Sequence, residues 1–455
     1  MKKFFSFKIK IILAALLFVA SSVFFASLSS ASGEEAVKTY VLTAGKWGKF
    51  QDSAAIMAGG TVTFSHKGTG VGVVKSSAPD FLEKALASRA FTDGAEDMMI
   101  EWQPPTEVVQ FDQASVTPGD ETFFFMQWHL GAIEAEAAWD AGYTGDGVRI
   151  AILDGGMPAD HIDIAPNLDF AASASFVPGL DFDQDSNTFR HAGHVAGIAA
   201  APDNGMGTIG VAPDATIIGV KVLDGGSGYF SWLIEGIEYA SRSLAEGGAG
   251  ADIINMSLAG VVCKNGGAGP LVGALNKIIT TATRRGVLVI SAAGNNGFNF
   301  DHSWDCAVLP AESGNGIAIS ATGPLGWALG ETNFRRPASY TNHGNSLVHV
   351  AAPGGDYALP GDDLCTVGFI THYCWVLDMV FSVYSGTSSY GWAAGTSMAA
   401  PVVAGVAALV KERYPGITVG QWKNILANSA DDEGKKGHDP FYGRGFINAR
   451  RAVTE

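Results

Sequence analysis

The sequence predicts an α/β protein: a doubly wound, mostly parallel sheet with helices on both faces, preceded by a small α/β domain. Two observations predict the sheet. Short apolar runs alternate along the chain with longer amphipathic stretches, and the short runs are apolar throughout rather than at every second position. Strands that are apolar on both faces belong in a sheet covered on both sides, and alternating β and α segments give right-handed crossovers between parallel strands.

Six apolar runs are expected to form the buried strands. They are residues 148–153, 216–222, 252–256, 287–292, 317–320 and 347–351. Three longer amphipathic stretches, 230–244, 271–285 and 398–414, are expected to form helices. Ligands of such sheets bind at the carboxyl ends of the strands, so functional residues are sought there.

The composition is that of a globular protein with an acidic surface. Of the 455 residues, 47% are hydrophobic and 16% are charged, and the net charge is −16. The body of the chain has no cluster of Lys and Arg. This argues against a partner that is a nucleic acid or an anionic membrane surface.

Residues 1–32 are predicted to be a secretory signal peptide. Lysines precede an apolar stretch, 11–28, and small residues at 29–32 offer a cleavage site. The apolar stretch is also long enough for an uncleaved membrane anchor, but the small residues favour cleavage. We therefore expect a secreted or periplasmic protein that has no membrane segment once the signal is removed.

The next block, 33–120, is expected to be a propeptide that folds as a small α/β domain. Short strands are predicted at 40–42, 61–64 and 71–75, and a helix at 79–88, where proline suits the first position. Residues 104–121 are polar and have no helical period, which indicates a linker or processing region. The main domain is then 121–455.

Four cysteines in an exported chain predict two disulfides, which can pair in three ways. Cys365 and Cys374 bracket a short loop and are the first expected pair, which leaves Cys263 with Cys306. The alternative is free buried thiols. The spacings do not match a zinc site.

Three residues at the predicted strand and helix ends suit nucleophilic catalysis, which needs a hydroxyl, an imidazole and a carboxylate. Asp154 follows the strand 148–153, His191 opens a helix of small residues, and Ser397 lies at a helix N-terminus, which favours an anion. For each residue considered alone, the alternative is a structural role: Asp154 as a turn residue, His191 as a surface or core residue, and Ser397 as a helix cap.

Two further polar residues accompany these three. Asn295 follows the strand 287–292, where its amide can donate to an oxyanion; the alternative is a turn asparagine, since Asn-Gly follows directly. His194 neighbours His191 on one helix face. The two histidines suggest a metal pair, but no third ligand is evident.

In combination these residues resemble the subtilases, the subtilisin-like serine proteases. The order Asp, His, Ser and the segment Gly-Thr-Ser-Met-Ala-Ala-Pro at 395–401 carry the resemblance, which covers about residues 123–453. Supporting matches lie at 211–213, 254–258, 292–295, 351–354 and 445–449. A lipase or esterase is not indicated, because Ser397 does not lie in Gly-x-Ser-x-Gly.

The resemblance implies a secreted serine endopeptidase that is made as a zymogen. Asp154 would orient His191, His191 would act as general base and acid, and Ser397 would attack the peptide carbonyl. Asn295 and the Ser397 backbone N–H would form the oxyanion hole. The segment Ser257, Leu258 and Ala259 would be the edge strand that binds the substrate backbone.

The resemblance also implies the partners and cofactors. Protein or peptide substrates are expected, with the chain's own propeptide as inhibitor and a monomer as the active form. The chemistry needs no cofactor. A structural calcium ion is possible at Asp163 and the loop 202–208, and the peptide bond 309–310 is expected to be cis.

Two departures from the family pattern concern residues beside the triad. Gly155 stands where the family has Ser or Thr, and Ala192-Gly193 replaces Gly-Thr between the two histidines. The lost hydroxyls keep an alternative open, a catalytically weak or inactive subtilase that binds peptides. The segment 355–390 is longer than the family pattern needs, and we expect it to shape the substrate cleft with its cysteines as a brace.

Overall fold

A seven-stranded sheet forms the centre of the main domain. Its strands follow the order β16 (Val350–Pro353), β15 (Ile317–Thr322), β13 (Leu288–Ala292), β11 (Ile253–Met256), β7 (Arg149–Asp154), β9 (Thr216–Lys221) and β8 (Ala174–Ser175). Every neighbouring pair is parallel. The six predicted strands are all present, although the last begins later than expected, at Val350.

The computed structural model describes residues 36–45, 48–102, 106–111, 122–263, 266–302 and 305–455. The predicted signal peptide lies outside the described residues. The chain divides into two units, 1–37 and 38–455, and the following description concerns the second. None of the described helices is long and apolar enough to cross a membrane.

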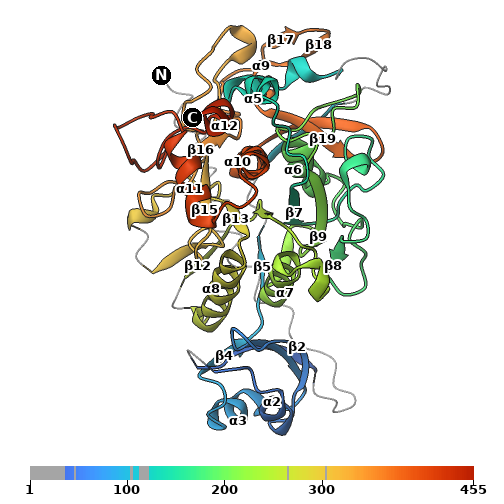
Figure 1. The fold of residues 1–455 in the computed structure, drawn as a ribbon, viewed down its shortest axis with the longest axis vertical. Helices are drawn as coiled ribbons and strands as arrows, with labels where there is room; N and C mark the ends of the chain where they lie inside the picture. Colours follow the sequence, from blue (N-terminus) through green and yellow to red (C-terminus); the bar gives the residue numbers. More distant parts are fainter. Residues whose placement is uncertain (1–35, 46–47, 103–105, 112–121, 264–265, 303–304) are drawn as a thin grey trace, which may run out of the picture. The chain divides into compact units, whose positions relative to one another are not determined.

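Helices cover both faces of the sheet, as its apolar strands require. On β7, Ile150 and Ile152 pack into one core while Ala151 and Leu153 pack into another. Helices α6 (His191–Ala200) and α10 (Thr396–Arg413) belong to the first core, and α7 (Phe230–Ser241) and α8 (Gly269–Arg284) to the second. Figure 1 shows these two layers of helices.

The order of the strands reverses direction between β7 and β11. The chain passes from β7 to β8 and β9 on one side, and then to β11, β13, β15 and β16 on the other. A crevice for a ligand forms at the carboxyl ends of the strands where the order reverses. Asp154 is the last residue of β7, and Ser257 directly follows β11.

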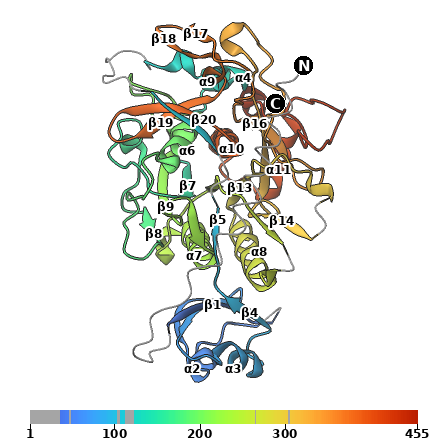
Figure 2. The ribbon, with the colours of Figure 1, turned by 180° about the vertical axis from the view of Figure 1, so that it is seen from behind.

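A smaller three-stranded antiparallel sheet, in the order β19-β20-β6, corrects two predictions. Strand β6 (Glu107–Phe111) lies inside the predicted linker 104–121 and pairs with β20 (Ser389–Ala394). The predicted loop 355–390 contains β17 (Leu364–Val367), β18 (Ile370–Tyr373), α9 (Cys374–Leu377) and β19 (Val380–Ser385). Figure 2 shows β19 and β20 with the neighbouring strand. Strand β6 is short and gains its partner only through folding, so the local pattern did not reveal it.

The block after residue 37 is a four-stranded antiparallel sheet in the order β2-β3-β1-β4 with two helices. Its elements are β1 (Lys38–Thr43), α2 (Asp52–Met57), β2 (Thr61–His66), β3 (Val71–Ser76), α3 (Phe81–Ala87) and β4 (Asp93–Glu96). Tyr40 and Leu42 of β1 pack within this block, whereas Val41 packs into the core that contains α7 and α8. The Lys277 Nζ on α8 donates to the Ala44 carbonyl at 3.1 Å.

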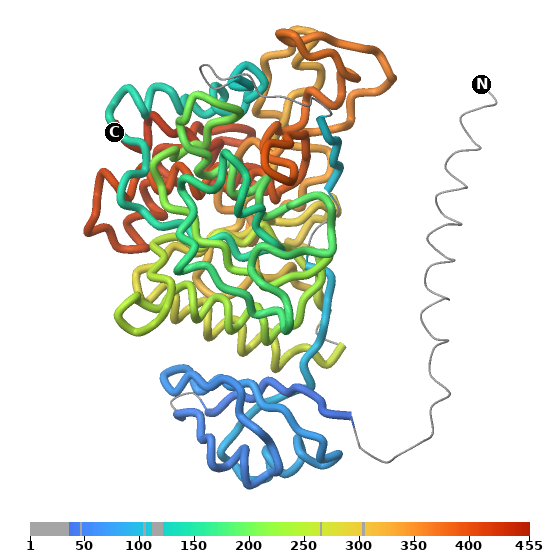
Figure 3. Tube along the Cα trace, turned by 90° about the vertical axis from the view of Figure 1, so that its right-hand side faces the viewer, coloured from blue at the N-terminus to red at the C-terminus, as the bar shows by residue number. Residues whose placement is uncertain are grey.

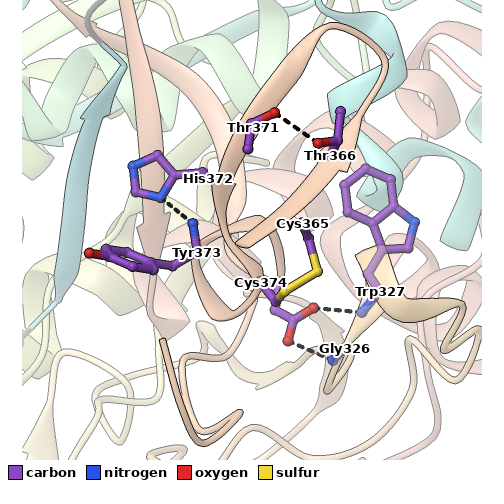
Figure 4. Close-up of a disulfide and its surroundings, with 9 residues drawn as sticks. Gly326, Trp327, Cys365, Thr366, Thr371, His372, Tyr373 and Cys374 are labelled. Atoms are coloured by element: carbon purple, nitrogen blue, oxygen red, sulfur yellow. Dashed lines mark hydrogen bonds between the residues drawn. A yellow bond between two sulfur atoms is a disulfide. The ribbon is translucent and has the colours of Figure 1, made fainter. Parts of the chain in front are cut away.

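Both predicted disulfides are present. Cys263 and Cys306 face each other in the hairpin of β12 (Gly260–Cys263) and β14 (Cys306–Leu309). The Cys365–Cys374 bridge ties β17 to the start of α9, as Figure 4 shows. The Leu309–Pro310 bond is cis, as the resemblance implied. The remaining helices and paired strands are β5 (Met99–Glu101), α4 (Trp128–Ala132), α5 (Ala135–Asp140), β10 (Ser227–Tyr229), α11 (Val419–Asn428) and α12 (Ala449–Thr454).

Candidate active site

A buried carboxylate–imidazole pair lies at the end of β7. His191 Nδ1 lies 2.9 Å from Asp154 Oδ1 and 2.8 Å from Asp154 Oδ2. Asp154 is 1% exposed and His191 4% exposed, so water does not compete for this contact. Because a carboxylate only accepts, Nδ1 is the nitrogen that carries the proton. Nε2 is then the nitrogen able to accept one, and it has no hydrogen-bond partner among the described residues.

Ser397 is the second residue of α10 and is buried. Its Oγ donates to the Ser257 carbonyl at 3.1 Å, and Ser257 Oγ donates back to the Ser397 carbonyl at 2.7 Å. In this conformation the hydroxyl is therefore not directed at His191. Rotation about the Cα–Cβ bond of Ser397 is required to bring Oγ to the imidazole.

The side chain of Asn295 is held in one orientation by α10. Its Oδ1 accepts from the Thr396 backbone N at 2.9 Å and from Thr396 Oγ1 at 2.7 Å. These two bonds identify Oδ1 as the acceptor and turn Nδ2 the other way. Nδ2 lies 2.9 Å from where a Cβ on Gly395 would stand, so glycine is needed there for the close approach.

The loop that carries Asn295 is organised by a residue that sequence reasoning missed. Buried Asn342 accepts at Oδ1 from the backbone N of Asn296 at 3.1 Å and of Phe298 at 3.0 Å, and its Nδ2 donates to the Ala293 carbonyl at 2.8 Å. No local signal marks Asn342, because its partners lie more than 40 residues away along the chain.

The departure at Gly155 has a local structural reason. A Cβ on Gly155 would stand 2.2 Å from Asp185 Oδ2, and the same oxygen accepts from Gly156 N at 2.6 Å. The Asp185 carboxylate thus occupies the space beside Asp154, whose Oδ1 accepts from Gly155 N at 2.7 Å. Sequence reasoning did not identify Asp185, which lies in the segment before α6.

A positive charge accompanies these carboxylates. Lys221 is buried at the end of β9, directly opposite Asp154 in the parallel pairing. Its Nζ donates to the Leu223 carbonyl at 2.6 Å and to Asp224 at 3.1 Å, and it lies 3.9 Å from Asp185 Oδ2. A buried charge needs such partners, and Lys221 balances part of the negative charge beside Asp154.

The second departure also follows from packing. A Cβ on Gly193 would stand 2.4 Å from Pro158 Cγ, so a larger residue would require Pro158 to move. Glycine at this position lets α6 approach the segment that follows β7.

The predicted substrate-binding segment meets another part of the same chain. Ala259 N donates to the Trp102 carbonyl at 2.7 Å, and Trp102 N donates to the Gly226 carbonyl at 3.0 Å. Just before Trp102, β5 pairs antiparallel with β10. Ser257 and Leu258 are buried. The stretch 99–102 therefore lies in an extended form beside Ala259 on one side and β10 on the other.

His194 is a core histidine in this structure. It is fully buried, both ring nitrogens have no partner among the described residues, and burial lowers its pKa to about 3. No group of three or more His, Cys, Asp or Glu side chains within the described ranges is placed to hold a metal ion. The suggested metal pair of His191 and His194 therefore finds no support.

The residues around Asp163 do not fit a calcium cage. Oδ2 of Asp163 accepts from Thr208 N at 2.8 Å, Thr208 Oγ1 at 3.0 Å and Tyr390 OH at 2.9 Å. Calcium needs converging oxygen lone pairs, whereas three N–H and O–H donors point at this oxygen. Burial raises the pKa of Asp163 to about 6.

Most of the chain is similar to known proteins. A family model described as Subtilase family matches residues 145–445. Subtilisin Savinase from Lederbergia lenta is 36% identical over 327 residues, which cover 72% of this chain and 98% of that protein. M-protease from Shouchella clausii (strain KSM-K16) is also 36% identical over 327 residues, covering 72% of this chain and 69% of that protein.

Two solved structures show the same fold. The epidermin leader peptide processing serine protease from Staphylococcus aureus superposes with a TM-score of 0.72 at 20% identity, covering 92% of this chain and 98% of that one. A protease from Pseudoalteromonas arctica PAMC 21717 has a TM-score of 0.57 at 28% identity, covering 74% of this chain and 99% of that one.

Proposed function

Because this chain belongs to the subtilase family and is a serine endopeptidase, we propose that Asp154, His191 and Ser397 are its catalytic triad. Asn295 and the Ser397 backbone N–H are proposed as the oxyanion hole, and Ser257–Ala259 as the edge that binds substrate. The proposal rests on the buried contact between Asp154 and His191 at the end of β7. The three residues also follow one another along the chain in the family's order.

In the proposed mechanism the Asp154 carboxylate holds Nδ1–H of His191, which leaves Nε2 as the base. Ser397 Oγ turns from Ser257, gives its proton to Nε2 and attacks the peptide carbonyl. The resulting oxyanion accepts hydrogen bonds from Asn295 Nδ2 and Ser397 N. His191 then protonates the leaving amine, and water hydrolyses the acyl-enzyme by the same steps with His191 again as base.

The alternative of a weak or inactive peptide-binding protein rested on the two lost hydroxyls. Asp154 keeps a hydrogen bond from the Gly155 backbone N–H, and the Asp185 carboxylate fills the space that a side chain at 155 would need. Both departures thus accommodate neighbouring groups, and the Asp154–His191 contact is intact beside them, which supports the active enzyme.

We also propose that the protein is exported as a zymogen and cleaved between Trp102 and Thr106. Trp102 is bonded to Ala259, two residues from Ser257, which contacts Ser397. On the other side Glu107 pairs with Ala394, three residues before Ser397. The described stretches 99–102 and 106–111 therefore attach on either side of the nucleophile, and they follow one side of the main body in Figure 3.

The sequence within this interval narrows the expected bond. Pro104 and Pro105 follow Gln103, and the ring of a proline crowds the residue before it. The bonds before the two prolines are therefore poor candidates, which leaves Trp102–Gln103 and Pro105–Thr106. We choose Pro105–Thr106 because it lies directly before β6. The predicted boundary at residue 120 thereby moves to 105 in this proposal.

Two disulfides fit an oxidising compartment, which supports export.

Expression of the wild type and of Ser397→Ala tests the proposal. We expect the wild type to mature to an N-terminus at Thr106 and to react with a fluorophosphonate probe. Ser397→Ala should stay uncut and unlabelled, and its turnover of a peptide substrate should fall at least about a thousandfold. Ser429→Ala, at a buried serine on the end of α11, is the matched control and should mature normally. Self-cleavage of purified Ser397→Ala at the wild-type rate would refute the triad.

A further inference from the structure

We propose that the β19–β20 hairpin is an extended binding edge for the leaving side of the substrate, the residues that follow the bond that is cut. A bound substrate would add a third strand to β20 where β6 now lies, and would place an aromatic side chain where Phe111 lies. This inference rests on the proposed triad and names a substrate preference of the same site.

Strand β6 leads away from the nucleophile along β20. The antiparallel register runs from Glu107 opposite Ala394 to Phe111 opposite Tyr390. Strand β20 ends directly before Gly395, and Thr106 Oγ1 lies 3.4 Å from where a Cβ on Gly395 would stand. Figure 2 shows this strand beside β20. Backbone pairing of this kind accepts peptides of many sequences, while side-chain pockets give selectivity.

The chain contacts the two sides of the proposed site in succession. Trp102 is bonded to Ala259 of the proposed substrate-binding segment, and a few residues later Glu107 pairs with Ala394 of β20. In this proposal the Ala259 side binds the acyl residues, and β6 then occupies the place of the leaving-side residues.

One side chain of β6 enters an aromatic pocket. The Phe111 ring centroid lies 5.6 Å from that of Phe123, 6.0 Å from that of Phe381 and 5.6 Å from that of Trp392, all edge to face. These three partners are at most 1% exposed. Edge-to-face ring pairs add binding energy beyond the area they bury, so the pocket selects for an aromatic residue.

Beside Gln110, β20 has a glycine, which lets the backbones of β6 and β20 lie close together and forms no pocket for a side chain. Gln110 faces Gly391 in the register. A Cβ on Gly391 would stand 2.6 Å from the Val109 carbonyl and 2.7 Å from the Tyr384 ring. Glycine at this position therefore permits the third strand to pair.

The disulfide-tied hairpin β17–β18 supports the pocket. The His372 ring lies 5.2 Å from the Trp392 ring, and the Phe369 ring lies 6.3 Å from the Phe123 ring. Figure 4 shows His372 on this hairpin, beside the Cys365–Cys374 bridge. The long segment 355–390 thereby has a function, because it supports two walls of the pocket.

The edge remains open to exchange. Val108, Val109 and Phe111 are only half-buried, and Glu107 and Gln110 are exposed. After cleavage at Pro105–Thr106, β6 is held by its pairing and by one covalent end. A substrate with a matching leaving side can therefore compete with it for β20.

Three internally quenched peptides with the same acyl side test this inference on the mature enzyme. The first has two leaving-side residues, the second has Thr-Glu-Val-Val-Gln-Phe, and the third has the same six residues with Ala in place of Phe. We expect kcat/KM for the Phe peptide to exceed that for either of the others at least tenfold, mainly through a lower KM. Values within twofold for all three would overturn the proposal.

A variant locates the effect in the pocket. Trp392→Leu should bring the ratio of the Phe peptide to the Ala peptide close to one, whereas Leu244→Ala, an exposed apolar residue on another surface, should keep the ratio. An unchanged ratio in a folded Trp392→Leu protein would contradict the proposed pocket. Should Trp392→Leu fail to fold, the three-peptide comparison on the wild type still decides.

The free hexapeptides provide a readout that needs no turnover. Fluorescence anisotropy of labelled Thr-Glu-Val-Val-Gln-Phe, with its Ala counterpart, measures binding to the enzyme directly. Tenfold tighter binding of the Phe peptide upholds the edge even for a protein that cleaves none of the substrates, a result that would refute the proposed function alone. Equal binding of the two peptides would overturn the edge.

Discussion

At the scale of single residues, the space beside Asp154 is shared by groups from three segments. Gly155 N bonds to the carboxylate, Asp185 occupies the position that a side chain at 155 would need, and buried Lys221 lies opposite. Each group depends on the others, since a side chain at 155 displaces a carboxylate and a displaced carboxylate loses its partners. Gly155, which departs from the family pattern, is thus matched to Asp185 and Lys221 around Asp154.

A double-mutant cycle tests this dependence. Gly155→Ser restores the family residue, but its Cβ would meet Asp185 Oδ2 at 2.2 Å, so we expect kcat/KM to fall about ten- to a hundredfold. In Gly155→Ser/Asp185→Ala the space is free, and kcat/KM should rise above that of Gly155→Ser. Peptide hydrolysis by the wild type, Gly155→Ser, Asp185→Ala and the double variant measures the coupling. Losses that simply add would show that the two positions are independent.

At the scale of elements, the site is assembled where loops meet the end of the parallel sheet. The loop after β13 carries Asn295, and Asn342 holds that loop through three hydrogen bonds. Gly294, at a φ of +92°, allows the turn, and a Cβ there would stand 2.5 Å from Asn342 Nδ2. Asn342 is therefore a positioning residue that acts through Asn295.

Substitution of Asn342 should affect the transition state more than substrate binding. Asn342→Ala leaves Asn296 N and Phe298 N without their acceptor, and we expect kcat to fall about ten- to a hundredfold with KM little changed, the size expected for partial loss of an oxyanion donor. Asn342→Asp keeps an acceptor and should recover part of kcat. Asn424→Ala, on α11, is the control.

Steady-state kinetics with a peptide substrate separates this role from a merely structural one. A loss confined to KM, or an Asn342→Asp protein no better than Asn342→Ala, would contradict the assignment.

At the scale of the whole molecule, burial of ionisable groups makes stability depend on pH in opposite directions. Burial lowers the pKa of His129 and of His194 from 6.5 to about 3. The folded state favours the neutral form of both histidines. Their contribution to the free energy of unfolding is therefore fully present above pH 6.5 and is lost as the pH falls toward 3. Burial raises the pKa of Asp163 and of Asp378 to about 6, so these two groups favour folding below about pH 4 and less so above pH 6.

The histidine shifts are the larger, so we expect the melting temperature to fall between pH 7 and pH 4. His194→Leu in the Ser397→Ala background, which prevents self-digestion, removes one group that must gain a proton. The difference in Tm between the two pH values should shrink by a few degrees. Scanning calorimetry measures it, with His302→Leu at an exposed position as the control. An undiminished difference in His194→Leu would show that His194 does not contribute to acid unfolding.

The sequence by itself determined the central sheet, its main helices and the candidate triad, whereas it only favoured one of three cysteine pairings, which the structure confirms. Apolar runs report burial on both faces, and short polar motifs stand at the strand and helix ends, so both can be recognised from neighbouring residues alone. Asp185 beside Gly155, Asn342 behind Asn295, and β6 on β20 were decided only by the tertiary structure. Each joins segments far apart along the chain, and such contacts arise from the packing of the fold, which a local pattern does not encode.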